Sequence, residues 1–182
     1  MSLQSKVLIV VFALCCAHAN ANTPITSPDD LSPRAEHKRA TRLITHFLAN
    51  YHYKKPPLDD ALSEKIFDRY IEMLDPTKSY LLQSDIDEFY KHRPLIDDYL
   101  RHSDLQPIYD VYVRYRERVE GRIAKAIALL GQSFDFTREE TFTFDRKESE
   151  WAATNEALDE LWRKRVKNDT LSLQLAGKER EE

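Results

Sequence analysis

Apolar residues recur at intervals of three and four along most of the chain, which is the period of an amphipathic α-helix. The first such stretch predicts a helix over roughly 33–52, on the apolar positions Ala40, Leu43, Ile44, Phe47, Leu48 and Tyr51. Pro56 and Pro57 follow it, and proline disfavours helix before itself. A second helix should begin near Asp59, a good N-cap residue, and stop at Asp75 and Pro76. Its stripe is Leu62, Ile66, Phe67, Tyr70, Ile71 and Leu74.

The middle of the chain predicts two short helices and one long one. The first short helix is capped within Ser84–Asp87 and ends at Phe89, and the second covers 94–100. The long helix should run from Leu105 or Pro107 to Leu130, with Gly131 as its C-terminal cap. Its apolar face is Ile108, Val111, Tyr112, Tyr115, Val119, Ile123, Ile127 and Leu130.

In the last third of the chain, apolar and polar residues first alternate, and the spacing typical of a helix then resumes. Phe134, Phe136, Phe142 and Phe144 alternate with polar residues, which predicts an extended segment, either a short hairpin or a loop fixed by its aromatic rings. Thr154 should cap a last helix, which is followed by Leu171, Leu173, Leu175 and Gly177. The chain is therefore expected to be mainly all-α, an irregular domain of about five to six helices with a short extended Phe-rich segment.

The first residues are typical of a secretory leader. Lys6 precedes an apolar run over 7–16 that is shorter than the roughly 20 residues a helix needs to span a bilayer. Small residues at positions 17, 19 and 21 offer cleavage sites, so 1–21 is predicted to be a signal peptide; an uncleaved anchor is the alternative. Beyond it we expect a flexible lead-in over 22–33, a helical domain over 34–178 and a charged tail over 179–182.

Composition narrows the possible functions. Three glycines in 182 residues exclude Gly-rich phosphate loops, dinucleotide fingerprints and the Gly-x-Ser-x-Gly nucleophile turn. Both cysteines lie within the leader, so the mature chain has no thiol for a disulfide, a metal or catalysis. Export without disulfides indicates the bacterial periplasm or a similar space. The net charge of -4 offers no general attraction for nucleic acid or anionic lipid.

Polar clusters in the helical region have structural explanations. Adjacent carboxylates do not face each other on a helix, so Asp59-Asp60 and Asp97-Asp98 favour helix N-terminal charge or solvation over acid–base catalysis. The segment 75–87 resembles a calcium loop, but Tyr80 and Ile86 stand where that loop needs glycine and glutamate. No zinc-binding spacing relates the histidines beyond the leader, which are His37, His46, His52, His92 and His102.

Three further motifs are weak indicators of function. The basic cluster 163–167 follows acidic residues by one turn, which predicts an exposed face with intrahelical ion pairs. The Arg-Tyr alternation over 112–118 could stack on nucleobases, but the acidic chain makes this a minor option. The triplet 168–170 matches a glycosylation acceptor, a motif too short to be specific. We expect no catalytic, cofactor-binding or metal-binding residue in this chain.

The stretch Ser63–Phe89 resembles the start of the periplasmic tail-specific, or carboxy-terminal processing, serine proteases. The similarity continues over nearly the whole mature chain. Its blocks are Lys65–Tyr70, Leu74-Asp75, Leu81-Leu82, Ser84-Asp85, Phe89, Tyr109–Tyr112, Asp135–Thr137, Asp145-Arg146, Trp151, Leu161-Trp162, Val166-Lys167, Asp169, Leu171–Leu173, Leu175 and Gly177-Lys178.

The resemblance implies a helical N-terminal domain that precedes a PDZ-containing core with a Ser–Lys catalytic pair. Such proteases trim or degrade periplasmic proteins from exposed apolar C-termini. The chain contains neither the PDZ segment nor the strands and catalytic pair of the core. We therefore expect an N-terminal domain truncated before the PDZ and catalytic domains, which is not catalytic alone and serves scaffold, substrate-access or adaptor-contact roles.

The expected partners follow from the same resemblance. They are the rest of the protease, encoded separately or downstream, and periplasmic adaptor or protein substrates. We expect no cofactor, no nucleic acid and, once the leader is removed, no membrane. The alternative hypotheses are a free-standing periplasmic helical module that binds a protein partner and, third, an enzyme in its own right.

Overall fold

A computed structural model describes residues 31–54 and 57–177. Within these residues the chain forms six α-helices and one 3-10 helix, in the order α2 (Ala35–Tyr51), α3 (Asp60–Leu74), α4 (Gln83–Phe89), η2 (Tyr90–Leu95), α5 (Ile96–His102), α6 (Gln106–Leu130) and α7 (Asn155–Leu175). The described part contains no β-strand, and an isolated parallel bridge joins Leu82 to Ala152. The predicted all-α fold is confirmed. The predicted leader 1–21, most of the lead-in 22–33 and the tail 179–182 lie outside the described residues, so the predicted domain boundaries stay predictions.

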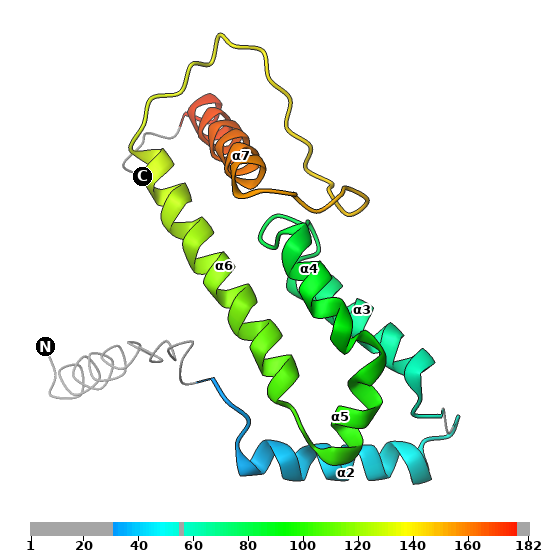
Figure 1. Ribbon diagram of the computed structural model, residues 1–182. Helices are drawn as coiled ribbons and strands as arrows, with labels where there is room; N and C mark the ends of the chain where they lie inside the picture. Colours follow the sequence, from blue (N-terminus) through cyan, green and yellow to red (C-terminus); the bar gives the residue numbers. More distant parts are fainter. Residues whose placement is uncertain (1–30, 55–56, 178–182) are drawn as a thin grey trace, which may run out of the picture.

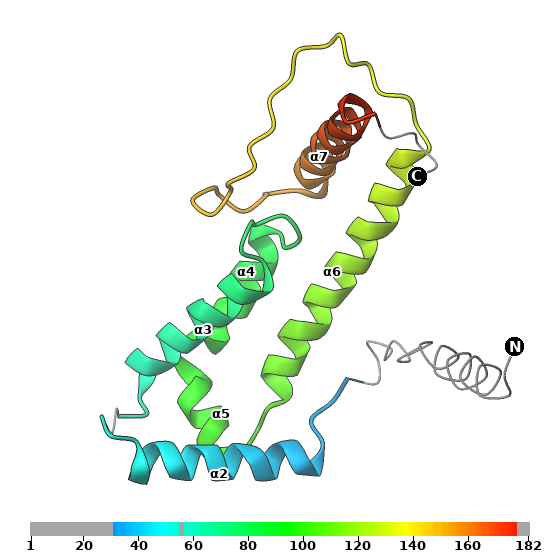
Figure 2. The same cartoon turned by 180° about the vertical axis from the view of Figure 1, so that it is seen from behind.

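The long helix α6 extends from the end of the domain near α2 to the end near α7 (Figure 1). Helices α3, α4 and α5 gather beside one part of α6, and α7 lies beside its C-terminal half. Helix α2 lies across the opposite end of the domain, as the view from behind also shows (Figure 2). The segment between α6 and α7 runs as a wide arc around α7 before it returns to the tip of α4.

Helix boundaries follow the local chemistry that the sequence predicts. The Asp59 side chain accepts a hydrogen bond from the Leu62 N–H (3.0 Å), and the Thr154 hydroxyl accepts one from the Ala157 N–H (3.2 Å), so both predicted N-caps are confirmed. Gly131 is the C-cap of α6 but has φ -73°, a right-handed conformation that does not require glycine. The Phe-rich segment forms a loop without a strand, in which the rings of Phe142 and Phe144 pair edge to face.

The first of two apolar cores fills the space between α3, α4, α5 and α6. Its buried members are Phe67, Ile71, Leu81, Ile86, Phe89, Ile96 and Val111. The Ser63 hydroxyl and Asp97 exchange hydrogen bonds of 2.8 Å, which satisfy two buried polar groups between α3 and α5. Tyr70 donates from its hydroxyl to the Ile108 carbonyl (3.3 Å) and so connects α3 to α6.

The second core lies between α6, α7 and the turn that follows α3. It consists of Leu82, Leu158 and Trp162, with Tyr80, Ala126, Ala152 and Leu161 packed against them. The Trp162 indole N–H donates to the Ser79 carbonyl over 2.6 Å. Guanidinium and ammonium groups of Arg122 and Lys125 pair with Asp159, which adds a polar connection between α6 and α7.

The turn over 75–82 separates the two cores. The Asp75 side chain is 1% exposed and accepts hydrogen bonds of 2.9–3.0 Å from the N–H groups of Ser79, Tyr80 and Leu81. Lys78 has φ 49°, a left-handed conformation that reverses the chain. Because side chains alternate along an extended segment, Leu81 enters the first core while Leu82 enters the second.

The apolar stripes predicted from the sequence are buried only in part. On α3 the prediction holds for Phe67 and Ile71, whereas Ile66 is 37% exposed. On α6 the N-terminal half packs through Val111, but Ile127 is 64% exposed. The whole predicted apolar stripe of α2 is solvent-accessible, because α2 contacts the domain through the row that contains the buried Thr41.

Replacement of Leu158 by Ala should remove the centre of the second core. Leu158 has 0% exposure, so we expect its loss to reduce the free energy of unfolding by about 2–5 kcal/mol. Urea unfolding followed by far-UV circular dichroism measures this. Leu173→Ala is the matched control, since that side chain on the same helix is 57% exposed and its loss should change stability by less than about 0.5 kcal/mol. Equal losses in the two variants would contradict the assigned core.

Candidate functional site

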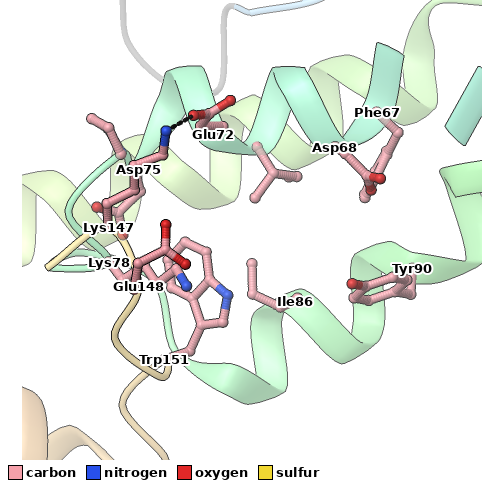
Figure 3. A pocket seen from close by; sticks show the side chains of 12 residues that line it. Phe67, Asp68, Glu72, Asp75, Lys78, Ile86, Tyr90, Lys147, Glu148 and Trp151 are labelled. Carbon is pink, nitrogen blue, oxygen red and sulfur yellow. Dashed lines mark ion pairs between the residues drawn. The ribbon is translucent and has the colours of Figure 1, made fainter. Parts of the chain in front are cut away.

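A groove of about 310 Å³ lies between α3, α4 and the segment over 146–151. Figure 3 shows apolar side chains on its floor, among them Phe67, Ile86 and Trp151. Charged side chains surround them, and Lys147 pairs with Glu72 across the opening (3.4 Å). The residues that line the groove include no serine, threonine, cysteine or histidine.

Several charged groups around this groove are paired or hydrogen-bonded. The Lys78 ammonium donates to the Ser149 carbonyl (2.6 Å) and lies over the Trp151 ring at 5.6 Å. Hydrogen bonds from Arg69 and then Lys147 lower the pKa of Glu72 below its usual value. The groove therefore combines charged side chains at its opening with an apolar floor. These contacts fix the 146–151 segment against α3 and the turn that follows it.

A buried carboxylate connects α4 to α6. Asp85 is 1% exposed and accepts hydrogen bonds of 2.9 Å from the Arg118 guanidinium, with Arg114 at 3.2 Å and the Leu82 N–H at 3.0 Å. Burial alone would raise the pKa of Asp85, but the bonds from Arg118 and Leu82 outweigh it and hold the pKa below its usual value. Arg114 and Arg118 of the 112–118 motif thus connect two helices, whereas Arg116 pairs with Glu120 on α6 itself (2.7 Å).

A second ion-pair cluster fixes the long loop to α7. Glu140, on the loop, accepts from the Arg163 guanidinium and from the Lys167 ammonium (2.6 Å). Hydrogen bonds from Arg163 and then Lys167 lower the Glu140 pKa to about 2. The prediction of an exposed basic face is therefore wrong for Lys167, which is 9% exposed and pairs with the loop residue Glu140. Sequence spacing could not show this, because Glu140 is far from α7 along the chain.

The histidines and paired carboxylates of the sequence do not converge on one site. The Nδ1 atoms of His37 and His92 lie 2.9 and 2.8 Å from the hydroxyls of Tyr109 and Tyr99. Burial lowers the His92 pKa. Within residues 31–54 and 57–177, no group of three or more His, Cys, Asp or Glu is placed to hold a metal ion.

The paired carboxylates serve helix ends and packing. Asp59 caps α3, and Asp60 begins that helix. Asp97, in the first turn of α5, is 2% exposed, so plain solvation does not describe it. The structure uses Asp75 of the calcium-like segment as an acceptor for backbone N–H groups. The part of the chain that the structure describes contains no helix long and apolar enough to cross a membrane.

Exposed apolar side chains gather at the C-terminal ends of α6 and α7. Ile127 and Leu130 on α6 are 64% and 51% exposed, and Leu173 and Leu175 on α7 are 57% and 80% exposed. We call these four residues the α6–α7 apolar end. The C-terminal ends of α6 and α7 both lie at the end of the domain remote from α2 (Figure 1). The sequence placed Ile127 and Leu130 on the apolar face of the long helix, and periodicity alone could not show that both side chains are more than half exposed.

Comparison with known proteins gives a consistent family. Residues 44–182 match the model described as "Tail specific protease N-terminal domain". The tail-specific protease of Haemophilus influenzae (strain ATCC 51907 / DSM 11121 / KW20 / Rd) is 38% identical over 164 residues. The match covers 88% of this chain and 24% of that relative, so the chain spans about a quarter of the length of the relative.

Replacement of Glu140 by Gln should destabilise the domain at neutral pH and have little effect in acid. The folded-state pKa of about 2 lies below the usual value of 4.5, so the ionised carboxylate stabilises the fold above pH 4.5. This contribution is lost as the pH falls from 4.5 toward 2. Urea unfolding of both proteins at neutral pH and at several acid pH values measures the difference. A difference that stays constant across this range would contradict the assigned pairing.

Proposed function

This chain belongs to the family of tail-specific protease N-terminal domains, and from that membership we propose that it serves as the non-catalytic helical domain of a periplasmic serine protease. In this role it carries no part of the catalytic machinery. It acts as a scaffold beside a PDZ-containing core that trims or degrades proteins from apolar C-termini. The relative's greater length leaves ample chain for such a core.

The observation that carries the proposal is the α6–α7 apolar end. Four large apolar side chains near the C-terminal ends of these two helices are each more than half exposed. Large apolar side chains that a domain leaves exposed are candidates for an interface. We infer that this end packs against the remainder of the protease, where burial of each leucine contributes about 1.5–3 kcal/mol.

The polar contacts support a scaffold. The Ser63 hydroxyl donates a hydrogen bond to the Asp97 carboxylate (2.8 Å), and the Lys167 ammonium donates one to the Glu140 carboxylate (2.6 Å). The first hydrogen bond joins α3 to α5, and the second joins the long loop to α7. Asp75 holds the turn after α3, and Trp162 binds the Ser79 carbonyl of that turn, so α7 is fixed to it.

The periplasmic location rests on the sequence. The predicted leader over 1–21 directs export, and the rest of the chain has no cysteine that would need a particular redox environment.

A chimera tests this function directly. This chain would replace the matching quarter of the H. influenzae protease, and the hydrolysis rate of a reporter protein with an apolar C-terminus would be measured. We expect an active chimera, and about tenfold or greater loss in the double variant Leu130→Glu/Leu173→Glu, because glutamate prevents burial at the interface. Met73→Glu is the matched control, since Met73 is 70% exposed but lies on α3.

Each outcome of this experiment bears on one part of the proposal. Circular dichroism of the isolated variants shows whether they fold, as their exposed positions predict. An active chimera that tolerates the double variant would contradict the docking surface. A folded but inactive chimera, or hydrolysis of the reporter by the purified chain alone, would contradict the scaffold role.

A further inference from the structure

A cavity of about 140 Å³ lies where three segments that are distant along the chain meet. The turn after α3 contributes Thr77 and Ser79, the long loop between α6 and α7 contributes two phenylalanines and Arg146, and α7 contributes Arg165 and Asp169. The cavity shares no lining residue with the groove of Figure 3. A water molecule takes up about 30 Å³ in the liquid, so the cavity has room for a small organic group.

Arg146 brings an unpaired positive charge to this cavity. Its side chain is half-buried, and its Nε atom is buried without a hydrogen-bond partner among the described residues. The neighbouring basic residues of the loop differ from it, because Arg138 pairs with Glu140 and Lys147 pairs with Glu72. A buried donor without an acceptor costs free energy, and folded proteins rarely leave one. An acceptor that enters the cavity would remove this cost.

Arg165 supplies a second guanidinium group. It lies over the Trp162 ring at 4.9 Å, and the Trp162 indole is itself held by the Ser79 carbonyl (2.6 Å), which fixes the position of the positive charge. The Arg165 Nε atom lies 4.0 Å from a carboxylate oxygen of Asp169, too far for a hydrogen bond. Two guanidinium groups and one carboxylate give the lining a net charge of +1.

The hydroxyl groups of the cavity are engaged with the turn itself. The Thr77 hydroxyl donates to Ser79 Oγ (3.0 Å), and the Ser79 hydroxyl donates to the Thr77 carbonyl (3.1 Å). The side-chain donors that remain for a ligand are therefore those of Arg146 and Arg165. Their positive charge selects a ligand with negative charge.

We propose that this cavity binds a carboxylate. Guanidinium groups form charge-assisted hydrogen bonds with carboxylates, and two N–H groups of one arginine match the two carboxylate oxygens. The net charge of +1 balances a monoanion, whereas a doubly charged phosphate would be left with excess negative charge. The rings of Phe142 and Phe144, whose centroids are 5.0 Å apart, supply apolar surface for the group that bears the carboxylate.

The C-terminus of a peptide and an acidic side chain both present a carboxylate, so the test uses a probe for each. N-acetylphenylalanine carries a terminal carboxylate, and the α-amide of N-acetylglutamate carries a side-chain carboxylate. The uncharged amide of N-acetylphenylalanine and inorganic phosphate are the control ligands. The protein is residues 22–182, without the predicted leader, and every buried residue of both cores lies after position 60, so the cores are complete.

An NMR titration follows the N–H signals of the arginine side chains, and the signals that disappear in Arg146→Gln are those of Arg146. We expect at least one of the two carboxylates to shift these signals saturably, and to bind about tenfold or more tightly than the amide or phosphate. The carboxylate that binds more tightly identifies the source, and either order supports the proposal.

Three variants connect the binding to the charges of the cavity. Arg146→Gln should weaken carboxylate binding about tenfold or more, because its charge-assisted hydrogen bonds are lost. Asp169→Asn should strengthen binding about threefold or more, because a repelling charge is removed, and the side chain is 58% exposed, so the fold should be unchanged. Arg39→Gln is the matched control, since this exposed arginine lies on α2, remote from α7 (Figures 1 and 2).

Unshifted Arg146 signals with both carboxylates would overturn the proposal. Binding of the amide or of phosphate as tight as that of the carboxylates would overturn it too, as would an affinity that Asp169→Asn leaves unchanged. The proposal goes beyond the scaffold role and does not depend on it. The titration needs no protease core, so failure of the chimera leaves its result unaffected.

Discussion

The hydrogen bonds that Asp75 accepts hold the turn on which both cores depend. Three consecutive N–H groups, of Ser79, Tyr80 and Leu81, converge on one buried side chain, and this fixes the path of the backbone immediately before Leu82. Leu81 and Leu82 consequently enter different cores. The same turn presents the Ser79 carbonyl to Trp162, so α7 is positioned by a residue that ends α3. The placement of α7 depends on this contact.

Local structure could be predicted from the sequence because its causes are local. The period of the apolar residues placed the helices, and Asp59 and Thr154 could be identified as caps because an N-cap acts on the N–H group three residues later. The pairing of elements depends on residues that are distant in sequence. Nothing near Lys167 indicates that Glu140 reaches it, and Val111 and Ile127 belong to one stripe although one is buried and the other exposed.

The candidate surfaces were harder to predict for the same reason. An amphipathic pattern shows that a helix has an apolar face, but it does not show whether the domain itself covers that face. On α3 the pattern describes the core, and on α2 it describes surface. Family resemblance, which rests on many positions at once, gave the correct family where individual motifs such as the calcium-like segment did not point to a function.

Hydrogen exchange of the Asp75→Ala variant tests the central claim that this turn couples α7 to the first core. Amide exchange resolved by mass spectrometry would be compared between α7 and α3 in the variant and in the unaltered chain. If the turn positions α7, protection over Leu158–Val166 should fall first and by more than protection over Phe67–Ile71, because Trp162 loses the acceptor at Ser79. Unchanged protection of α7 in the variant would contradict the claim.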